Sequence, residues 1–451
     1  MYRSTAYAED DRDRERTETT VPAGWSRRDV LVNLCLIAGF FTLSWGLVRY
    51  GAWTYASAGG INLTLSDMFL LVVLLLLLGR GQLNASPFGA TTPVWFLGFL
   101  LFIGGLLAST LVNGDPLRWL SVGGQYVFAL LAIPMMLASF HRELLDRCMV
   151  AFVIGVALSQ AVTFVASFFV DYHDVWEFMG MDFITVRGRI GALSGNANIN
   201  GAMNTFGLLM ALYAARRSLM PKWLLLPCAG FLVWGIIASA SFTAFSLAAI
   251  AVPLFCLIVW PRNTILFGVP ALVLVIGLLA SGIPLPGAFE ERVAEALTSG
   301  DIEEAGTFAG RWQLAIEAWR LSGGTLLFGY GADGYKEISA YGAPVHVFPL
   351  LVLTEGGLVS LVGLVVMILL LWAIGASLLK QDRVDSALTL GLLVVFTGFA
   401  FSAPHMYARL WIGPIMLAML HGFAPRIESF ARQGTRRAEP LPVPAAGHQL
   451  A

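Results

Sequence analysis

Charged residues are scarce in this chain: Asp, Glu, Lys and Arg make up 13% of its 451 residues, whereas hydrophobic residues make up 57%. A soluble globular domain usually contains about a quarter charged residues, so the scarcity argues against a water-soluble protein. The net charge is −1 and the sequence has no basic stripe, which sets nucleic-acid binding aside. The composition instead favours lipid as the solvent.

Cysteine and metal-ligand patterns are also scarce. The cysteines are Cys35, Cys148, Cys228 and Cys256. All lie in or beside apolar runs, without the spacing of a metal site or the loop position of a disulfide, and we interpret them as packing residues. Residues 1–29 lack the short apolar stretch and cleavage site of a signal peptide. We predict disordered cytoplasmic tails over 1–29 and 424–451.

Long apolar runs, by contrast, recur along the chain. A membrane-spanning helix needs about 20 mostly apolar residues, and the sequence contains about twelve such runs. We therefore predict an all-α, polytopic integral membrane protein with about 12 transmembrane helices. Helices 1–9 are expected over 30–281, a long periplasmic loop over 282–356, between spans 9 and 10, and helices 10–12 over 357–423. The individual spans are expected near 30–48, 61–78, 93–112, 119–139, 148–170, 194–214, 222–238, 242–260, 263–281, 357–379, 386–402 and 405–423.

The distribution of basic residues predicts the orientation. If the N-terminus is cytoplasmic, most of the 28 Lys and Arg residues fall in tails and loops on the cytoplasmic side, as the positive-inside rule requires. Both termini are then cytoplasmic. The weakest point is the pair of spans 222–238 and 242–260, because merging them would reverse every later span. The basic residues Lys380 and Arg383 argue against that merger.

The first long outer loop, near 171–193, leads into a polar cluster. It holds Arg187 and Arg189, followed by a Gly- and Asn-rich stretch that contains Asn196, Asn198 and Asn200. Asparagine side chains offer donors and acceptors to a ligand. A turn followed by a capped helix is an equally good interpretation, and both interpretations stay open at this point.

The second long loop, 282–356, begins with an acidic stretch over 290–306 that we expect to form a solvated helix. The stretch 310–321 is expected to be a short helix at the membrane interface, anchored by Trp312 and Trp319. These segments lie outside the membrane in the predicted topology.

The end of this loop is expected to line a wet cavity. Gly329–Gly331 forms a Gly-rich turn without the strand–helix context of a nucleotide loop. The apolar run that follows is too long for one span, so we predict a half-helix or re-entrant piece near 345–355, which protein or a wet cavity has to cover. His346 is a candidate general base at the mouth of this cavity, although an ordinary loop histidine fits the sequence equally well.

Several polar side chains fall within the predicted spans. Asp67, Gln125, His405 and Arg409 lie in the outer parts of spans, and the inner parts look drier. Ionisable groups inside lipid are costly and usually face a functional interior. These residues therefore support an outward-facing site.

Arginines and a histidine around an outward-facing cavity suit an anionic, phosphate-bearing substrate, because guanidinium groups form bidentate contacts with phosphate oxygens. No ATP is available at the outer face, so the energy has to come with the substrate. A glycan on a polyprenyl diphosphate meets both requirements, since a diphosphate leaves readily once its charge is stabilised. A neutral histidine can then remove the proton of the acceptor hydroxyl. We expect no metal and no cofactor, because no carboxylate cluster or His-x-His pattern occurs.

At these residues the chain resembles the O-antigen ligase and O-antigen polymerase superfamily, over about Arg187 to Arg409. Arg189 with Asn198 and Asn200 is similar to the family's arginine followed by an Asn-containing helix start. The resemblance is strongest over Gly310 to Leu358, in Gly310-Arg311-Trp312, Trp319, Gly329-Tyr330-Gly331, His346 and Glu355-Gly356-Gly357.

The resemblance implies transfer of a lipid-linked glycan without metal or nucleotide. It gives His346 the role of base, or of positioning the acceptor, and gives Arg189 and Arg311 the role of holding the diphosphate. The candidate substrate-binding residues are Asn198, Asn200 and Glu355.

Two features depart from the family pattern. Val347 stands where the family often has Asn, and Ser241–Thr243 contains no arginine where the family often has one. Arg409 could substitute for that missing arginine as a further diphosphate-binding residue.

The resemblance also implies partners and a location. The donor would be a polyprenyl diphosphate-linked glycan, the acceptor a glycan or a lipid A core, and the setting the lipid of the bacterial inner membrane. Other polysaccharide-assembly proteins could be partners. Ligase and polymerase members share the pattern, so the acceptor stays open. The alternatives are a secondary transporter of a small polar or anionic solute, which predicts an internal repeat and discontinuous helices near the midplane, a peptidoglycan-polymerising glycosyltransferase and a non-catalytic scaffold.

Overall fold

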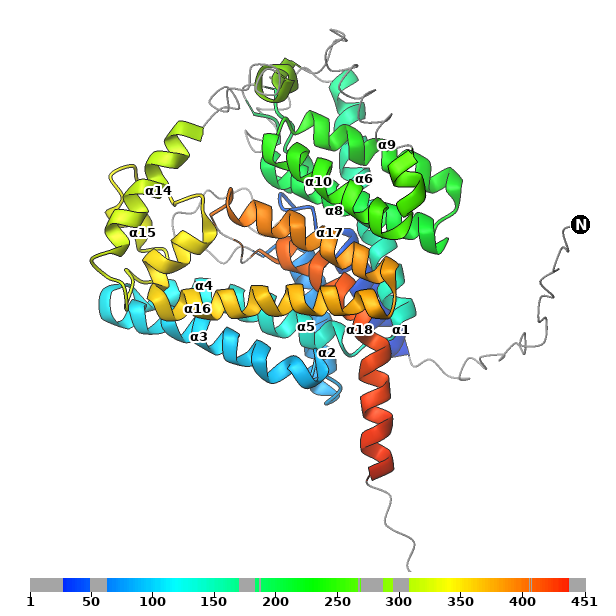
Figure 1. Ribbon diagram of the computed structural model, residues 1–451, viewed down its shortest axis with the longest axis horizontal. Helices are drawn as coiled ribbons and strands as arrows, with labels where there is room; N and C mark the ends of the chain where they lie inside the picture. The colour runs from blue at the N-terminus through cyan, green and yellow to red at the C-terminus, as the bar shows by residue number, and fades with distance from the viewer. Residues whose placement is uncertain are drawn as a thin grey trace, which may run out of the picture.

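Apolar runs fold into helices throughout the computed structural model (Figure 1), since a helix satisfies its own backbone groups without water. The structure describes residues 27–48, 63–169, 183–185, 188–266, 268, 287–294, 308–404, 406 and 408–437. The α-helices are α1 (Arg27–Phe41), α2 (Leu65–Gly79), α3 (Thr92–Asn113), α4 (Pro116–Val127), α5 (Ile133–Leu137), α6 (Arg142–Phe169), α8 (Ala197–Arg217), α9 (Lys222–Ala238), α10 (Phe242–Val259), α12 (Gly287–Phe289), α14 (Phe308–Ser322), α15 (Tyr335–Ile338), α16 (Phe348–Ser377), α17 (Arg383–Ala400) and α18 (Arg409–Arg437). Short 3-10 or π segments are η1 (Gly89–Thr91), η2 (Phe128–Ala132), η3 (Ala192–Ser194), η4 (Glu290–Ala294) and η5 (Leu378–Lys380).

Six helical segments among the described residues are long and apolar enough to cross a membrane. They are Gly89–Asn113, Pro116–Leu137, Arg142–Phe169, Phe242–Val259, Phe348–Lys380 and Arg383–Ala400. Two further apolar helices, α2 and α9, are shorter. The helical fold class is thus confirmed for the described residues, and these apolar helices support a membrane-embedded protein. The count of about 12 spans and the long periplasmic loop stay predictions.

Parts of the predicted domain boundaries cannot be compared with the structure. Most of the expected span 263–281 and residues 1–26 of the expected N-terminal tail lie outside the described residues. At the other end, α18 continues to Arg437, past residue 424, where the predicted C-terminal tail begins. Arg, Glu and Ala in this stretch are good helix formers and extend the helix that precedes them.

The pair of predicted spans around Ser239–Ser241 forms two separate helices. α9 ends at Ala238, and Ala240 adopts a left-handed conformation with φ of 44°. The Ser241 side chain then caps α10 by accepting a hydrogen bond from the Ala244 N–H at 3.4 Å. The two helices are therefore not merged.

Small residues allow α3 and α16 to pack closely along their lengths, and Figure 1 shows them side by side. A Cβ at Gly105 of α3 would collide with Ser360 of α16, and one at Gly363 would collide with the backbone of Phe102. The Ser360 hydroxyl donates a hydrogen bond of 2.8 Å to the Phe102 carbonyl. Such small-residue contacts are typical of helix pairs in membranes.

The helix α16 is interrupted at Gly357, where φ is 71°, two residues after the predicted half-helix ends. The interruption frees backbone groups that the Gly-rich turn satisfies. The Tyr330 N–H donates to the Thr354 carbonyl at 2.8 Å, and the Gly331 N–H donates to the Glu355 carbonyl at 2.9 Å. Protein, rather than the predicted wet cavity, therefore covers this break.

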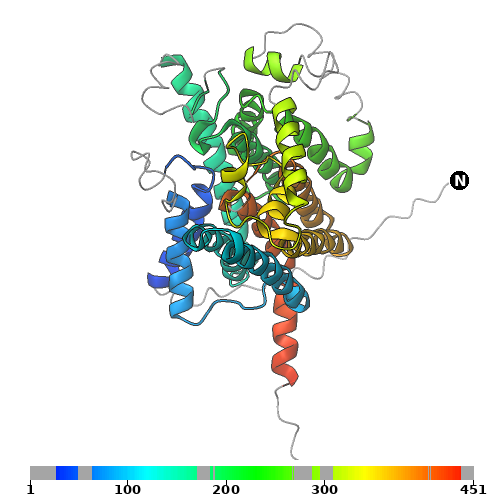
Figure 2. The ribbon, with the colours of Figure 1, turned by 90° about the vertical axis from the view of Figure 1, so that its left-hand side faces the viewer.

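The helices α14 and α15 lie beyond the end of the bundle at which α16 begins, on the left in Figure 1. Figure 2 looks at the molecule from this side. We call this end of the bundle the loop end. The end at which α16 finishes and α17 begins is called the opposite end.

Candidate functional site

Arg189 is carried by a tight hairpin. An antiparallel bridge joins Ile184 to Ile190, and Gly188 takes a φ of 73° that favours glycine in the turn. The Ile190 N–H donates to the Ala238 carbonyl at 3.0 Å. The hairpin is thereby fixed to the end of α9.

The Arg189 guanidinium is held by two hydrogen bonds. Its Nε donates to the Ser239 carbonyl at 3.0 Å, and its Nη2 donates to Asn198 Oδ1 at 2.7 Å. The Asn196 side chain caps α8 by accepting from the N–H groups of Asn198 and Ile199. The capped-helix interpretation therefore explains Asn196, while Asn198 orients the arginine.

Asn200 has a structural position. Its side chain is 1% exposed, and its Nδ2 donates to the Ile190 carbonyl at 2.9 Å. Its Oδ1 accepts a 2.7 Å hydrogen bond from Gln160 Nε2. These hydrogen bonds let Asn200 support the Arg189 hairpin, and its predicted substrate contact stays a prediction.

The segment 287–294 brings a third arginine to this region. Phe289 and Val293 are buried and pack with Ala240, next to the connection between α9 and α10. The described start of the acidic stretch, Glu290–Ala294, is a helical turn that exposes Glu290 and Glu291 and buries Val293. The rest of the expected solvated helix lies outside the described residues. Arg292 lies half-buried between Phe289 and Val293.

Arg311 lies on the buried side of α14. It precedes Leu314 by three residues and Ala318 by seven, a spacing that puts all three on one helical face. Leu314 and Ala318 are buried in a cluster with Val345, and Arg311 is half-buried. On the other side, Trp312 and Trp319 are 60% and 68% exposed, as expected for interfacial anchors.

The three guanidinium groups influence one another electrostatically. Burial, with the like charges of Arg292 and Arg311, lowers the pKa of Arg189 to about 10. Burial, with the charge of Arg292, also lowers the pKa of Arg311. Arg189 thus remains charged near neutral pH. We call Arg189, Arg292 and Arg311 the arginine cluster.

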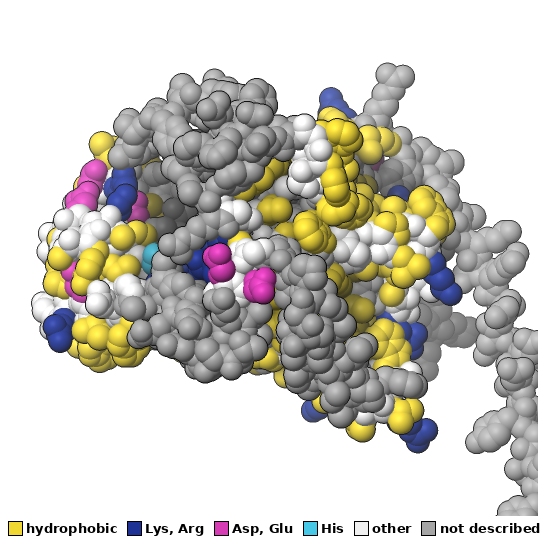
Figure 3. Space-filling model, turned by 90° about the horizontal axis from the view of Figure 1, so that it is seen from above, with side chains coloured by type: hydrophobic (Ala, Val, Ile, Leu, Met, Phe, Trp, Pro, Cys, Tyr) yellow, Lys and Arg dark blue, Asp and Glu magenta, His cyan; other side chains and the backbone are white. Residues whose placement is uncertain are grey.

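The arginine cluster concentrates positive charge. Neither Arg189 nor Arg311 forms an ion pair with a carboxylate among the residues that the structure describes. Partly desolvated guanidinium groups such as Arg189 and Arg311, which pair with no carboxylate among the described residues, suit a multiply charged anion. Toward the left of the face seen in Figure 3, basic, acidic and histidine side chains gather.

His346 lies between two residues that pack against α14. Val345 is buried and Val347 partly buried in the cluster that also contains Leu314, and the His346 side chain is half-buried. Arg311 and His346 thus belong to segments that form one packed unit. The role of His346 as a base stays a prediction.

Glu355 is buried and binds the backbone of residues 333–335. Its side chain is 7% exposed, and its carboxylate accepts hydrogen bonds from the N–H groups of Asp333 and Tyr335. Asp333 in turn forms an ion pair with Arg118 at 2.7 Å. The contacts of Glu355 thus fix residues 333–335, and its predicted substrate contact stays a prediction.

Arg409 is paired with a carboxylate. Its guanidinium donates to Asp67 and, at 3.2 Å, to Gln125 Oε1. Arg409 is 8% exposed and Asp67 2%. The structure thus joins Arg409, Asp67 and Gln125 in one buried polar group, while the predicted diphosphate-binding role of Arg409 stays a prediction. His405 and Arg187 lie outside the described residues.

Arg292 is the functional candidate that the sequence did not single out. In the sequence, Arg292 stands out only as a basic residue among acidic neighbours in an outer loop. Its position next to the other arginines depends on how Phe289 and Val293 pack. No group of three or more His, Cys, Asp or Glu side chains that could hold a metal ion occurs in the described parts of the chain.

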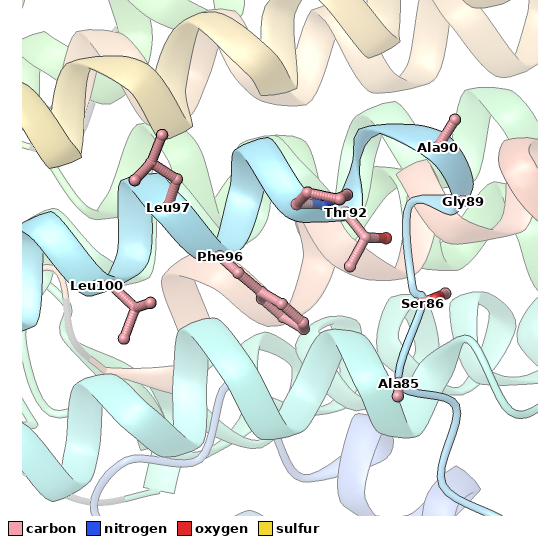
Figure 4. Close-up of a pocket in the computed structure, with 9 residues that line it drawn as sticks. Ala85, Ser86, Gly89, Ala90, Thr92, Phe96, Leu97 and Leu100 are labelled. Carbon is pink, nitrogen blue, oxygen red and sulfur yellow. The ribbon is translucent and has the colours of Figure 1, made fainter.

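An apolar groove lies away from the residues of the arginine cluster. It measures about 520 Å³ and is lined mainly by apolar side chains of α3 and the segment before it, including Phe96, Leu97 and Leu100 (Figure 4). None of the candidate site residues lines it. No protein-family model and no curated protein matches the chain in sequence.

Proposed function

We propose that this protein is a glycosyltransferase of the bacterial inner membrane that transfers a glycan from a polyprenyl diphosphate to a sugar hydroxyl at the periplasmic face. The arginine cluster is the observation that carries this proposal. It draws Arg189, Arg292 and Arg311 from separate segments to one partly buried place. Such a site stabilises a diphosphate, whose charge grows as the glycosidic bond breaks.

The proposed reaction is a displacement at the anomeric carbon. The acceptor oxygen forms the new glycosidic bond while the bond between the anomeric carbon and the diphosphate oxygen breaks. The electron pair leaves with the polyprenyl diphosphate, next to the arginine cluster. The acceptor proton passes to His346, which acts as general base.

The orientation follows from the same proposal. With both termini cytoplasmic, the loop end faces the periplasm, where a polyprenyl-linked donor is available without a nucleotide. Exposed Trp312 and Trp319 on α14 suit the membrane interface, which would place Arg311 near the depth of lipid phosphates. The acceptor, a lipid A core or a growing polysaccharide, separates ligase from polymerase activity.

A secondary transporter is the alternative, because α16 is discontinuous at Gly357 and transporters bind solutes at broken helices. The break lies near the loop end of α16, and the Gly329–Gly331 turn fills it. A filled break at one end of a helix offers no midplane binding site. This observation favours the transferase.

Deletion of the gene in its native host, followed by complementation, tests the proposal. We expect Arg311→Ala and His346→Ala to fail to restore the surface glycan, while lipid-linked glycan accumulates. Arg320→Ala is a matched control, because Arg320 is an exposed arginine on the same helix and should complement. Accumulation of long chains indicates a ligase, and accumulation of single repeat units indicates a polymerase. Full complementation by both test variants would refute the transferase and favour the transporter.

A further inference from the structure

The turn that follows α14 exposes three consecutive apolar side chains. Leu326 is 51% exposed, Leu327 60% and Phe328 46%, and we call these three residues the loop tip. The segment from Ser322 to Ala332 contains no charged residue. The sequence placed this segment in the loop outside the membrane, where such a run of apolar side chains would face water. An exposed apolar surface of this kind usually marks contact with another apolar phase.

Hydrogen bonds on both sides hold the loop tip between α3 and α16. The Leu358 N–H of α16 donates to the Leu326 carbonyl at 2.8 Å. On the other side, Asn113 Nδ2 of α3 donates to the Gly329 carbonyl at 2.9 Å. The Gly329 N–H donates to the Ser109 hydroxyl of α3, also at 2.9 Å. The two helices therefore set the position of the loop tip.

These contacts place the loop tip at the depth where both helices would leave the membrane. α3 has 22 residues, about the length that crosses the hydrocarbon core of a bilayer, and it ends at Asn113. The unbroken part of α16 begins after Gly357 and packs along α3. Because both of these boundaries contact the loop tip, it lies at the edge of the hydrocarbon core on the side of the loop end.

The side chains next to the loop tip are also apolar and exposed. Leu358 and Val359 follow the break in α16, and Leu111 and Val112 lie in the last turn of α3. On helices that span a membrane, exposed apolar side chains of this kind face lipid. The loop tip continues this surface and therefore faces the same phase.

We propose that the loop tip is a membrane anchor that inserts among the lipid acyl chains of the leaflet at the loop end. Acyl chains fit this surface better than a protein partner does, because the surface continues the lipid-facing sides of α3 and α16 and has no charged group to select a partner. Since α14 ends at Ser322, just before the loop tip, the anchor holds that end of α14 at the membrane surface. The anchor requires only that α3 and α16 span the membrane and is independent of the proposed glycan transfer.

Quenching of a fluorophore at the loop tip tests this anchor. Leu327→Cys, in the full chain, is labelled with nitrobenzoxadiazole and placed in nanodiscs of phosphatidylethanolamine and phosphatidylglycerol. Wild-type protein labelled in parallel gives the contribution of the native cysteines. We expect lipids with a nitroxide on the acyl chain to remove most of the fluorescence at residue 327, and soluble iodide to remove little of it.

Lys336→Cys is the matched control, because Lys336 is an exposed, charged residue of α15 in the same loop. Its label should be quenched by iodide and little by the lipid nitroxide.

The membrane anchor is rejected if iodide quenches labelled Leu327→Cys as strongly as labelled Lys336→Cys, because the loop tip would then lie in water. It is also rejected if neither quencher acts on residue 327, because a protein surface, such as that of a second copy of this chain, would then cover the loop tip. Should Leu327→Cys fail to fold, Leu326→Cys and Phe328→Cys are judged by the same two outcomes.

Discussion

The guanidinium of Arg189 donates a 2.7 Å hydrogen bond to the side-chain oxygen of Asn198, in the first turn of α8. The preceding Asn196 uses its own side chain to cap that helix. One short polar stretch thus starts a helix and orients an arginine of the proposed diphosphate site. Positioning by a rigid element is what a site that stabilises developing charge requires.

Substitution of Asn198 should therefore weaken transfer. A hydrogen bond to a charged group contributes about 1.5–3 kcal/mol, so we expect Asn198→Ala to lower kcat/KM by about tenfold to a hundredfold. Asn198→Asp should also impair transfer, because the new carboxylate would pair with Arg189 and oppose the substrate. Asn196→Asp, which adds the same charge but keeps the cap, is the control. Equal activity of Asn198→Ala and wild type would show that Arg189 does not need this bond.

The affinity for an anion should depend on pH through the charge of the arginines in the cluster. Arg189 is charged below its lowered pKa of about 10. The affinity of the purified protein for inorganic pyrophosphate should therefore show no loss from about pH 7 to pH 9, where the arginines stay charged and the ligand itself gains negative charge, and should fall as the pH rises through about 10, where arginine charge is lost. Isothermal titration calorimetry at each pH provides the measurement. A loss of affinity that begins near pH 7 would instead assign the anion to a histidine.

The break in α16 should tolerate no side chain at Gly357. An added Cβ would collide with the Leu327 carbonyl, and φ is 71°. Strain of this kind costs about 1–3 kcal/mol. We expect Gly357→Ala to lower the thermal midpoint of unfolding and the transfer rate together. Gly104→Ala is the control, because its Cβ would meet nothing within 4 Å; equal midpoints for both variants would contradict the packing described.

The pairing of Arg409 with Asp67 separates a structural role from the predicted diphosphate role of Arg409. Breaking a buried ion pair costs about 3–5 kcal/mol, so Asp67→Asn should strongly reduce the yield of folded protein. The double variant Asp67→Leu/Arg409→Met removes both charges and should fold, as judged by size-exclusion chromatography. Transfer by the double variant would confirm the structural role, whereas a folded but inactive protein would show that Arg409 contacts substrate.

Local patterns in the sequence predicted several features of the fold. The separation of α9 from α10 follows from the polar residues at 239–241, and the helix α14 follows from its apolar spacing and its tryptophans. The break in α16 follows from Gly357 in an overlong apolar run. Each of these features depends on residues close together in the chain.

Features that depend on distant segments were not predicted. Arg292 joins Arg189 because Phe289 and Val293 pack next to the end of α9. The Glu355 carboxylate, in α16, binds backbone N–H groups of the segment that precedes the helix. A contact with backbone groups leaves no pattern of side chains in the sequence. At the opposite end of the bundle, ionic contacts join Arg142 of α6, Arg217 of α8 and Asp385 of α17, and His421 of α18 lies beside them. In the sequence, only His421 stands out as a polar residue in an otherwise apolar run, because its neighbours depend on the packing of distant segments.

The most direct measurement of glycan transfer uses purified protein in nanodiscs and lipid-linked glycan extracted from the deletion strain. Release of polyprenyl diphosphate is measured with an acceptor glycan added or omitted. We expect acceptor-dependent release by the wild type and by Arg320→Ala, and a loss of at least about a hundredfold, or roughly 2.7 kcal/mol, in Arg311→Ala. Acceptor-dependent release that is undiminished in both Arg189→Ala and Arg311→Ala, or no release by the folded wild type, would contradict the proposed role of the arginine cluster.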